Sequence, residues 1–280
     1  MSSTKVKEIT RPILRWAGSK RKLLSKLLAC APKHFDRYIE PFLGSACYFL
    51  ALHPPKAILG DFNADLMDMY SVLRNYPKEI AEIVHDMPDT DDFYYSLRAR
   101  SSKELGSIER AARFIYLNRY CFNGVYRSNL RGEFNVPRGK HTGNIPSIDE
   151  FINCAKALKF ADLRNGDFEN CLSDVGVGDF IYVDPPYASV SRLSHGEYGY
   201  GSFNEKDINR FVYSLKEADK NGAVILLSYA YTPILKQMLP NWHHRKIVVK
   251  RHVAGFNHHR NEVQELIISN KSLPTNLDTI

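Results

Sequence analysis

Cysteine is scarce in this chain: only five occur among 280 residues, and no two of them form a C-x-x-C pair. Zinc knuckles and dithiol redox couples need such pairs, so neither is expected. The adjacent histidines His243-His244 and His258-His259 are poor metal ligands as well, because neighbouring side chains on a strand point apart. We therefore expect no metal site.

Long apolar runs are also missing. No stretch approaches the roughly 18 apolar residues of a membrane-spanning helix. The polar start, MSSTKVKEITRP, lacks the apolar core of a secretory signal. These absences lead us to expect a cytoplasmic protein without membrane contacts.

The excess of charge is modest and basic. Lysine plus arginine numbers 38 against 31 for aspartate plus glutamate, a formal net charge of +7. Such a balance suits a polyanionic partner, although a merely soluble surface accounts for it equally well. The 44% hydrophobic and 25% charged residues are ordinary globular values, and 280 residues suit one large α/β domain or one domain with an insertion.

The first part of the chain alternates strands, glycine turns and helices. RYIEPF, residues 37–42, is a short β run before Gly44, SACYFLALH is typical of a buried helix, and KAILGDFN is a second strand. Asp61 closes that strand, near the roughly 20-residue offset at which α/β nucleotide-binding folds place an acid on ribose hydroxyls. Capping of the next helix by Asp61 or Asn63 is the structural alternative.

A central module separates this part from a second strand-rich part. Residues 67–120 have a helical pattern, and residues 121–146 form a loop rich in Gly, Asn, Pro, Arg and aromatic residues. DFIYVDPPY then gives an apolar strand that stops at Pro185-Pro186, and KIVVKRHVAGF and EVQELIISN indicate a terminal β-hairpin. The alternation predicts a doubly wound α/β fold, in which ligands bind at the carboxyl ends of strands.

The most specific motif is Asp184-Pro185-Pro186-Tyr187. An exocyclic amine on a nucleobase is a poor nucleophile because its lone pair is delocalised into the ring, so acceptors for both amine hydrogens ease its methylation. The Asp184 carboxylate and the Pro185 backbone carbonyl can supply them, and the Tyr187 ring can stack on an extruded base. A strand end stiffened by two prolines is the structural alternative.

Residues 118–140 concentrate basic and aromatic side chains. Five basic residues occur there with a single acid, Glu133, which gives a local charge of +4. The interleaved aromatic residues are Tyr120, Phe122, Tyr126 and Phe134. This composition is typical of surfaces that bind phosphates and wedge between bases or stack on them. A solvated basic loop anchored by its aromatic residues is the alternative interpretation.

Four separated segments resemble, in the same order, the Dam family of DNA adenine methyltransferases: ILRWAGSKRKLL, YIEPFLGSACYF with GDFN, NRYCFNGVYRSNLRGEFNVPRGK and YVDPPY. The resemblance covers residues 13–270, nearly the whole chain. It implies a Rossmann-like α/β fold that binds S-adenosylmethionine and carries an inserted, mainly helical target-recognition domain. The implied division gives 1–66 and 148–280 to the catalytic domain and 67–147 to the insertion.

The resemblance also implies a set of S-adenosylmethionine contacts: Trp16, Lys20, Phe42, Gly44, Asp61, Asp167 and Asp184. In this set Trp16 walls the pocket, Lys20 lies near the donor's carboxylate, and Asp167 bonds its adenine ring. A core tryptophan and an ordinary turn aspartate are the alternatives for the first and last of these. Two positions depart from the family, which often has glycine where this chain has Ala46 and Ser19. They put the loop conformation in question, because Ala resists the positive φ that Gly allows.

DNA contacts are implied for Arg119, Asn123, Arg127, Arg131, Arg138 and Lys140. Asn123 and Arg127 fall at base-reading positions, and an arginine can donate two hydrogen bonds to guanine O6 and N7. Arg131 and Arg138 fall where phosphate contacts are expected, and Lys140 where a side chain approaches the site. GATC is a candidate target, although relatives with similar loops read other adenine-containing sites.

The sequence therefore predicts transfer of a methyl group from S-adenosylmethionine to N6 of an adenine flipped out of double-stranded DNA, with neither a covalent intermediate nor a metal. We expect a monomer in solution, with more than one copy able to bind one DNA. Methylation of cytosine N4 and a catalytically silent DNA-binding relative are the alternatives. Asp184 before P-P-Y favours adenine by resemblance. Restriction-modification, regulatory marking of DNA and a viral role are all open as contexts.

Overall fold

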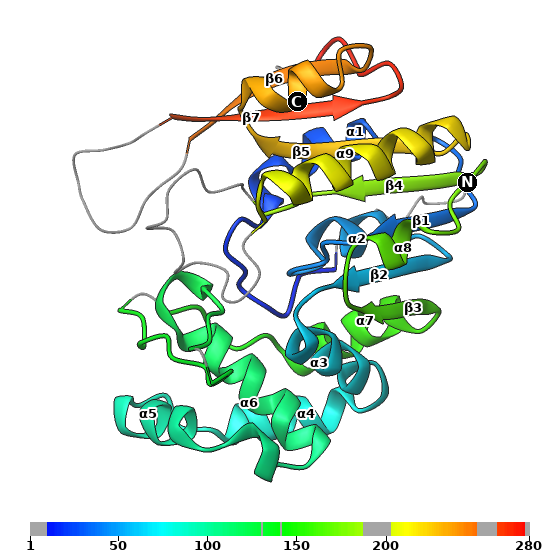
Figure 1. The fold of residues 1–280 in the computed structure, drawn as a ribbon. Helices are drawn as coiled ribbons and strands as arrows, with labels where there is room; N and C mark the ends of the chain where they lie inside the picture. Colours follow the sequence, from blue (N-terminus) through cyan, green and yellow to red (C-terminus); the bar gives the residue numbers. More distant parts are fainter. Residues whose placement is uncertain (1–9, 130, 141, 187–202, 251–261, 278–280) are drawn as a thin grey trace.

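The structure is a computed structural model that describes residues 10–129, 131–140, 142–186, 203–250 and 262–277. Seven strands of the described chain form one sheet in the order β3-β2-β1-β4-β5-β7-β6 (Figure 1). They are β1 (Arg37–Glu40), β2 (Ala57–Asp61), β3 (Ala161–Asn165), β4 (Asp179–Val183), β5 (Val224–Ala230), β6 (His243–Lys250) and β7 (Glu262–Ser269). Neighbouring strands from β3 to β5 run parallel, whereas β7 runs antiparallel to both β5 and β6.

The terminal hairpin predicted from the sequence is confirmed, because β6 pairs with β7 along its length, from His243 opposite Ser269 to Lys250 opposite Glu262. The order of the parallel strands reverses between β1 and β4: β2 and β3 lie beyond β1, and β5 lies beyond β4. Connections that leave two such neighbours diverge, which opens a crevice at the carboxyl ends of these strands. The topology therefore places a ligand site after β1 and β4.

Apolar side chains of the strands alternate between two buried cores. Tyr38 and Phe180 point into one core, and their neighbours Ile39 and Ile181 point into the other. Three helices pack on the first face: α1 (Leu24–Ala29), α2 (Cys47–Leu52) and α3 (Ala64–Asn75). Three others cover the second face: α8 (Glu169–Leu172), α9 (Glu205–Lys220) and α10 (Pro233–Met238). Helices on both faces of a mainly parallel sheet confirm the expected Rossmann-like α/β fold.

A group of helices lies beyond the β3 edge of the sheet (Figure 1). It contains α3, α4 (Pro77–Asp86), α5 (Asp91–Ala99), α6 (Ser107–Tyr120) and α7 (Ile148–Leu158), and a short 3-10 turn, η2 (Ser102–Glu104), precedes α6. α4 packs against α6 and α7, and α3, α4, α6 and α7 share the first core with the sheet. These helices thus extend outside 67–147 on both sides, and the division into two domains stays a prediction.

After α6 the described residues 121–129 and 131–139 form two arms that lie side by side, the first beginning with a 3-10 turn, η3 (Phe122–Gly124). Isolated bridges join Cys121 to Arg138 and Ser128 to Phe134 in antiparallel fashion. Gly132 turns the chain between these two arms at φ +78°, a conformation that glycine adopts without steric cost. We call residues 118–140 the recognition segment. In the described part of the chain, no helix is long and apolar enough to cross a membrane.

Candidate active site

A cavity of about 650 Å³ lies at the carboxyl ends of the strands, where the topology places a ligand site. The turns after β1, β2, β3 and β4 all contribute to its wall, and so does the segment before α1 that includes the 3-10 turn η1 (Lys20–Leu23). The structure brings together on this cavity every residue for which the sequence predicts a cofactor contact: Trp16, Lys20, Phe42, Gly44, Asp61, Asp167 and Asp184.

Gly44 and Trp16 are in close contact in the cavity wall. Gly44 has a φ of +48°, and a Cβ atom there would lie 2.8 Å from Cδ1 and 3.1 Å from Nε1 of Trp16. Tyr70 of α3 stabilises the turn, because its hydroxyl donates to the Gly44 carbonyl at 2.9 Å. The turn therefore requires glycine both for its backbone conformation and for the approach of the indole ring.

The two departures from the family's glycines have different consequences. Ala46 is fully buried and adopts the left-handed conformation, with φ 57° and ψ 25°, although it carries a Cβ atom. Ser19 has φ −50°, which any residue adopts, and its hydroxyl accepts a hydrogen bond from the Ser45 hydroxyl at 3.2 Å. Of these two positions, only Ala46 has a positive φ, so only Ala46 introduces backbone strain.

The Asp61 carboxylate is held by main-chain N–H groups of two turns that line the cavity. Its Oδ2 accepts from the Gly44 N–H, and its Oδ1 accepts from the Asn63 N–H, each at 3.0 Å. Burial raises the pKa of the Asp61 carboxyl above its ordinary value, and these hydrogen bonds lower it in part. Asn63, and not Asp61, caps α3, by accepting from the Leu66 N–H at 3.1 Å.

Asp184 follows β4 and forms an ion pair with the buried Lys20. The Lys20 ammonium lies 2.8 Å from Oδ1 of Asp184 and 3.7 Å from Oε2 of Glu265 on β7. Burial raises the pKa of Asp184, while Lys20 and a hydrogen bond from Ser228 lower it in part. The sequence predicted Lys20 near a ligand carboxylate; here the ammonium lies against the protein's own Asp184, so it fixes the direction of that carboxylate.

The prolines after Asp184 continue the cavity wall. Pro185 is buried, and Pro186 accepts a hydrogen bond from the Tyr229 hydroxyl at 3.5 Å through its carbonyl. Tyr187, the predicted stacking residue, lies outside the described residues.

Glu40 was missed by the sequence reasoning. It ends β1, is 3% exposed, lines the cavity and accepts from the Tyr38 hydroxyl at 2.7 Å. Burial raises its pKa to about 8, and the neighbouring carboxylates of Asp184 and Asp61 add to this rise. An acid that follows two apolar residues of a short strand, shortly before the glycine turn, was the available signal.

Tyr126 joins the recognition segment to the cavity, and this contact was also missed. Its ring stacks on Trp16, with centroids 6.0 Å apart, and on Phe114 of α6, with centroids 4.6 Å apart. Its hydroxyl donates to Asp65 Oδ2 at 2.6 Å. Ser128 and Gly132 line the cavity beside it, so one wall of the cavity comes from the recognition segment.

Asn118 fastens the N-terminal segment to α6. Its side chain accepts from the Arg15 N–H at 2.9 Å and donates to the Arg15 carbonyl at 2.6 Å, in full burial. Trp16, the next residue, is thereby held against α6. An asparagine that pairs with a backbone in this manner carries no sequence signal of its own.

The predicted DNA contacts divide into two groups. Asn123, Arg131 and Lys140 are exposed, and Arg127 is partly exposed with its Nε donating to Asn135 at 3.0 Å. Arg119 and Arg138 are engaged within the protein. Arg119 donates to the backbone carbonyls of Asn144 and Ile13, and its burial lowers its pKa to about 10.

Arg138 forms ion pairs with Asp89 and with Asp91 at the start of α5, the latter at 2.6 Å. Its guanidinium also lies over the Tyr120 ring, 5.6 Å from the centroid. These contacts tie the base of the recognition segment to α5 and α6. Among the described residues, no cluster of His, Cys, Asp or Glu has the arrangement of a metal site.

Comparison with known proteins gives a consistent result. The sequence profile of a family described as D12 class N6 adenine-specific DNA methyltransferase matches residues 16–264. A protein from Lactococcus lactis subsp. cremoris, "Type II methyltransferase M1.LlaDCHI", is 31% identical over 274 residues, which cover 93% of this chain and 95% of that protein.

Two further relatives extend the match to other organisms. "Type II methyltransferase M.MjaIII" from Methanocaldococcus jannaschii is 32% identical over 286 residues, covering 93% of this chain and 99% of that protein. "DNA adenine methylase" from Escherichia coli strain K12 is 28% identical over 262 residues, covering 92% and 94%. The similarity therefore includes the cavity and the recognition segment alike.

Proposed function

Since this chain belongs to the D12 class N6 adenine-specific DNA methyltransferases and methylates adenine N6 in DNA, we propose that its methyl donor is S-adenosylmethionine, bound in the cavity at the carboxyl ends of the strands. The observation that carries the proposal is the position of Asp184. It directly follows β4, on the same cavity as the glycine turn after β1 and Asp61 at the end of β2. Donor site and reaction site are thus one cavity.

The lining of the cavity fits this donor. Asp61, oriented by two main-chain N–H groups, would accept from the ribose hydroxyls. The backbone beside Gly44 and the indole of Trp16 would hold the methionine part, and Phe42 and Phe168 supply an apolar slot for the adenine ring. Glu40 suits the positive charges that the donor carries, because a nearby cation favours the ionised carboxylate.

When bound, S-adenosylmethionine supplies an electrophilic methyl carbon and a neutral thioether as leaving group. Asp184 and the Pro185 carbonyl accept the two amine hydrogens of the target adenine, which frees the nitrogen lone pair for the transfer. Lys20 holds Asp184 in place through Oδ1, at 2.8 Å. We propose that the Tyr187 ring stacks on the flipped base.

The recognition segment is the proposed DNA contact. Asn123 and Arg127 read base edges, and Arg131 and Lys140 contact the phosphate backbone or approach the site. Phe122, which is 50% exposed beside Asn123, is placed to enter the base stack. We retain GATC as the proposed target, and a cytoplasmic monomer, with more than one copy on a DNA, as the proposed working form.

Modification mapping of plasmid DNA tests the proposal. DNA treated with the protein and S-adenosylmethionine is expected to carry N6-methyladenine in GATC, with no N4-methylcytosine in the hydrolysed nucleosides. Asp184→Ala is expected to lower the transfer rate by about 1000-fold, the upper range for loss of one preorganised polar group, and to bind DNA as the unmodified protein does. Methylation at another adenine site would contradict GATC alone; methyl transfer that survives Asp184→Ala would contradict the assignment of the active site.

A further inference from the structure

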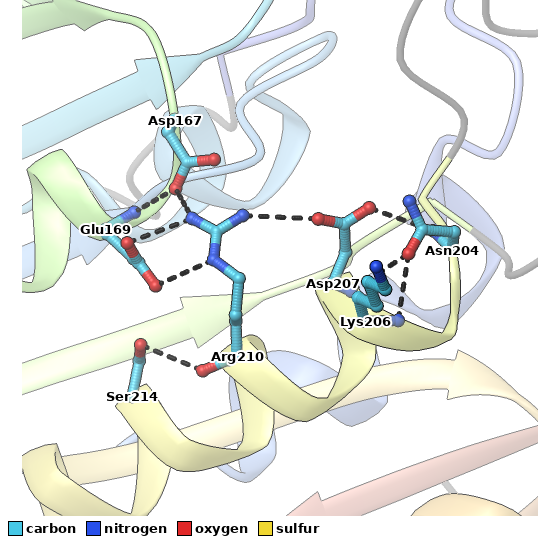
Figure 2. A network of polar contacts seen from close by, with 7 residues as sticks. All are labelled: Asp167, Glu169, Asn204, Lys206, Asp207, Arg210 and Ser214. Atoms are coloured by element: carbon cyan, nitrogen blue, oxygen red, sulfur yellow. Dashed lines mark hydrogen bonds and ion pairs between the residues drawn. The ribbon is translucent and has the colours of Figure 1, made fainter.

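Arg210 of α9 gathers three carboxylates at one side of the cavity (Figure 2). Its Nη2 lies 2.9 Å from Oδ1 of Asp167, and its Nε and Nη2 contact the two oxygens of Glu169 at 3.2 and 2.9 Å. Its Nη1 lies 3.2 Å from Oδ1 of Asp207. A guanidinium that binds one carboxylate through two nitrogens and two others singly has a fixed orientation.

The network leaves one oxygen of Asp167 for a ligand. Oδ1 of Asp167 accepts from Arg210 and from the Glu169 N–H, the latter at 3.0 Å. Among the described residues, none donates a hydrogen bond to Oδ2, and Asp167 lines the cavity. Two donors on one oxygen hold the carboxylate plane, and therefore the direction of the other oxygen.

The same guanidinium borders the apolar slot next to Asp167. It lies over the Phe168 ring at 5.2 Å from the centroid, and Phe168 packs against Phe42 with centroids 5.7 Å apart. Phe203 meets both rings, at 6.1 and 6.2 Å. Phe42, Phe168 and Phe203 all line the cavity, so the slot has aromatic walls with the Asp167 carboxylate at its edge.

Arg210 also contacts the start of α9, next to Phe203 in the slot. Asp207 Oδ2 accepts from the Asn204 N–H at 3.0 Å in the capping box of the helix, while Oδ1 pairs with Arg210. Phe203 immediately precedes that cap and is 8% exposed. A single side chain thus connects the turn after β3, the first turn of α8 and the start of α9 (Figure 2).

We propose that Arg210 is a positioning residue that aims the Asp167 carboxylate at the exocyclic amine of the donor's adenine ring. This inference rests on the proposed binding of S-adenosylmethionine in the cavity. Without Arg210, Asp167, Glu169 and Asp207 form an uncompensated cluster of three negative charges, and mutual repulsion turns Asp167 toward solvent. The aromatic slot remains, because Phe42, Phe168 and Phe203 each also pack against Phe211 of α9. What is lost is the acceptor that distinguishes an amino purine from an oxo purine.

Binding of two nucleoside ligands tests this role without any methyl transfer. S-adenosylhomocysteine presents an amine at purine C6, whereas S-inosylhomocysteine presents a carbonyl that Asp167 cannot accept from. We expect the unmodified protein to prefer the adenosyl ligand by about 30-fold in Kd, the range for a hydrogen bond to a charged group. Arg210→Gln should reduce this preference to about threefold, by weakening adenosyl binding while leaving inosyl binding nearly unchanged.

Arg164→Gln is the matched control. Arg164 also pairs with a surface carboxylate, Asp162 at 2.7 Å, and donates to the Asn170 carbonyl of α8 at 2.6 Å, but it does not contact Asp167. It should keep the 30-fold preference. If Arg210→Gln lowered the affinity for both ligands equally, or left the preference unchanged, the inference would be overturned. If the unmodified protein bound neither ligand, the donor assignment itself would fail.

Discussion

The cavity and the recognition segment treat their charged groups in opposite ways. In the cavity Lys20 and Glu40 are nearly inaccessible, and Asp61 is held by main-chain N–H groups. In the recognition segment Asn123, Arg131 and Lys140 project into solvent. A buried charge is tolerated only when it is oriented and paired, because its desolvation costs free energy. An exposed charged residue contributes little to stability and can be replaced with little effect on the fold. In the function that we propose, the methyl-transfer site is therefore held by buried contacts of the fold, and the target is chosen by exposed side chains.

The two regions meet at Tyr126. Its ring belongs to the recognition segment by sequence and to the cavity wall by position, stacked on Trp16. Asn118 strengthens this junction, since it pins the backbone of Arg15 to α6. Substitutions on either side of the junction should therefore separate donor binding from target choice.

Gly44→Ala should impair donor binding most. The new Cβ would lie 2.8 Å from Trp16 Cδ1, and Ala would be strained at φ +48°. Together, overpacking and backbone strain amount to about 3 kcal/mol, so the Kd for S-adenosylmethionine should rise about 100-fold in calorimetric titration. Gly132→Ala is the control, because φ is +78° there but no atom lies within 4 Å of the new Cβ. A similar loss of donor affinity in the control would show that strain alone, and not the contact with Trp16, is responsible.

Arg127→Ala should impair target choice while sparing the donor site. Loss of a base-reading arginine costs about 2 kcal/mol of discrimination, or about 30-fold between the cognate site and a site with one changed base pair. Arg131→Ala, which removes an exposed cation from the same segment, should weaken binding to both DNAs alike and lower the salt dependence. Competition binding at two salt concentrations measures both. Equal discrimination by the two variants would contradict base reading by Arg127.

Glu40 should make the ligand-free protein less stable at higher pH. Burial raises its pKa from 4.5 to about 8, so the folded chain binds this proton more tightly than the unfolded chain does. The free energy of unfolding therefore falls as the pH rises from about 4.5 toward 8, by on the order of 4 kcal/mol. Glu40→Gln should flatten this slope in urea titrations at pH 5, 6.5 and 8. Glu133→Gln removes an exposed carboxylate and should keep the original slope; an unchanged slope in Glu40→Gln would rule out Glu40 as its source.

Ala46→Gly should have the smallest effect, and on stability only. Glycine relieves about 1–2 kcal/mol of left-handed strain at φ 57° but loses a buried methyl group and gains unfolded-state freedom, so the net change should be near zero. Ala112→Gly in α6 loses the same methyl group in a fully buried helical position, without strain to relieve. Urea unfolding should therefore find Ala112→Gly less stable by about 1–2 kcal/mol than Ala46→Gly. Equal losses would mean that Ala46 is unstrained.

Much of this architecture is predictable because it depends on local patterns. The glycine turn before a buried helix, the acid at the end of β2 and the D-P-P sequence after β4 each have a signature in a few consecutive residues, and all three line one cavity. The helix over Ile148–Leu158 also begins with a local sequence signature of a helix N-terminus, the capping box of Ser147 and Glu150.

Other features depend on contacts between distant segments. The pairing of Lys20 with Asp184 and Glu265 joins three regions of the chain, and the Arg210 network joins α9 to the turn after β3. Arg119 and Arg138 show the converse, because a basic, aromatic composition does not reveal which guanidiniums are occupied by the protein itself. The composition of the recognition segment predicts a basic, aromatic surface, but only the fold shows which of its arginines are exposed there.

The central claim is that the methyl donor occupies the cavity against Trp16, and the fluorescence of that residue tests it most directly. The chain has two tryptophans, so Trp242→Phe leaves Trp16 as the single reporter. We expect a saturable change in its emission on addition of S-adenosylmethionine, reproduced by S-adenosylhomocysteine and shifted about 100-fold in concentration by Gly44→Ala. Donor binding, measured by calorimetry, that leaves the Trp16 emission unchanged would place the donor elsewhere and contradict the account.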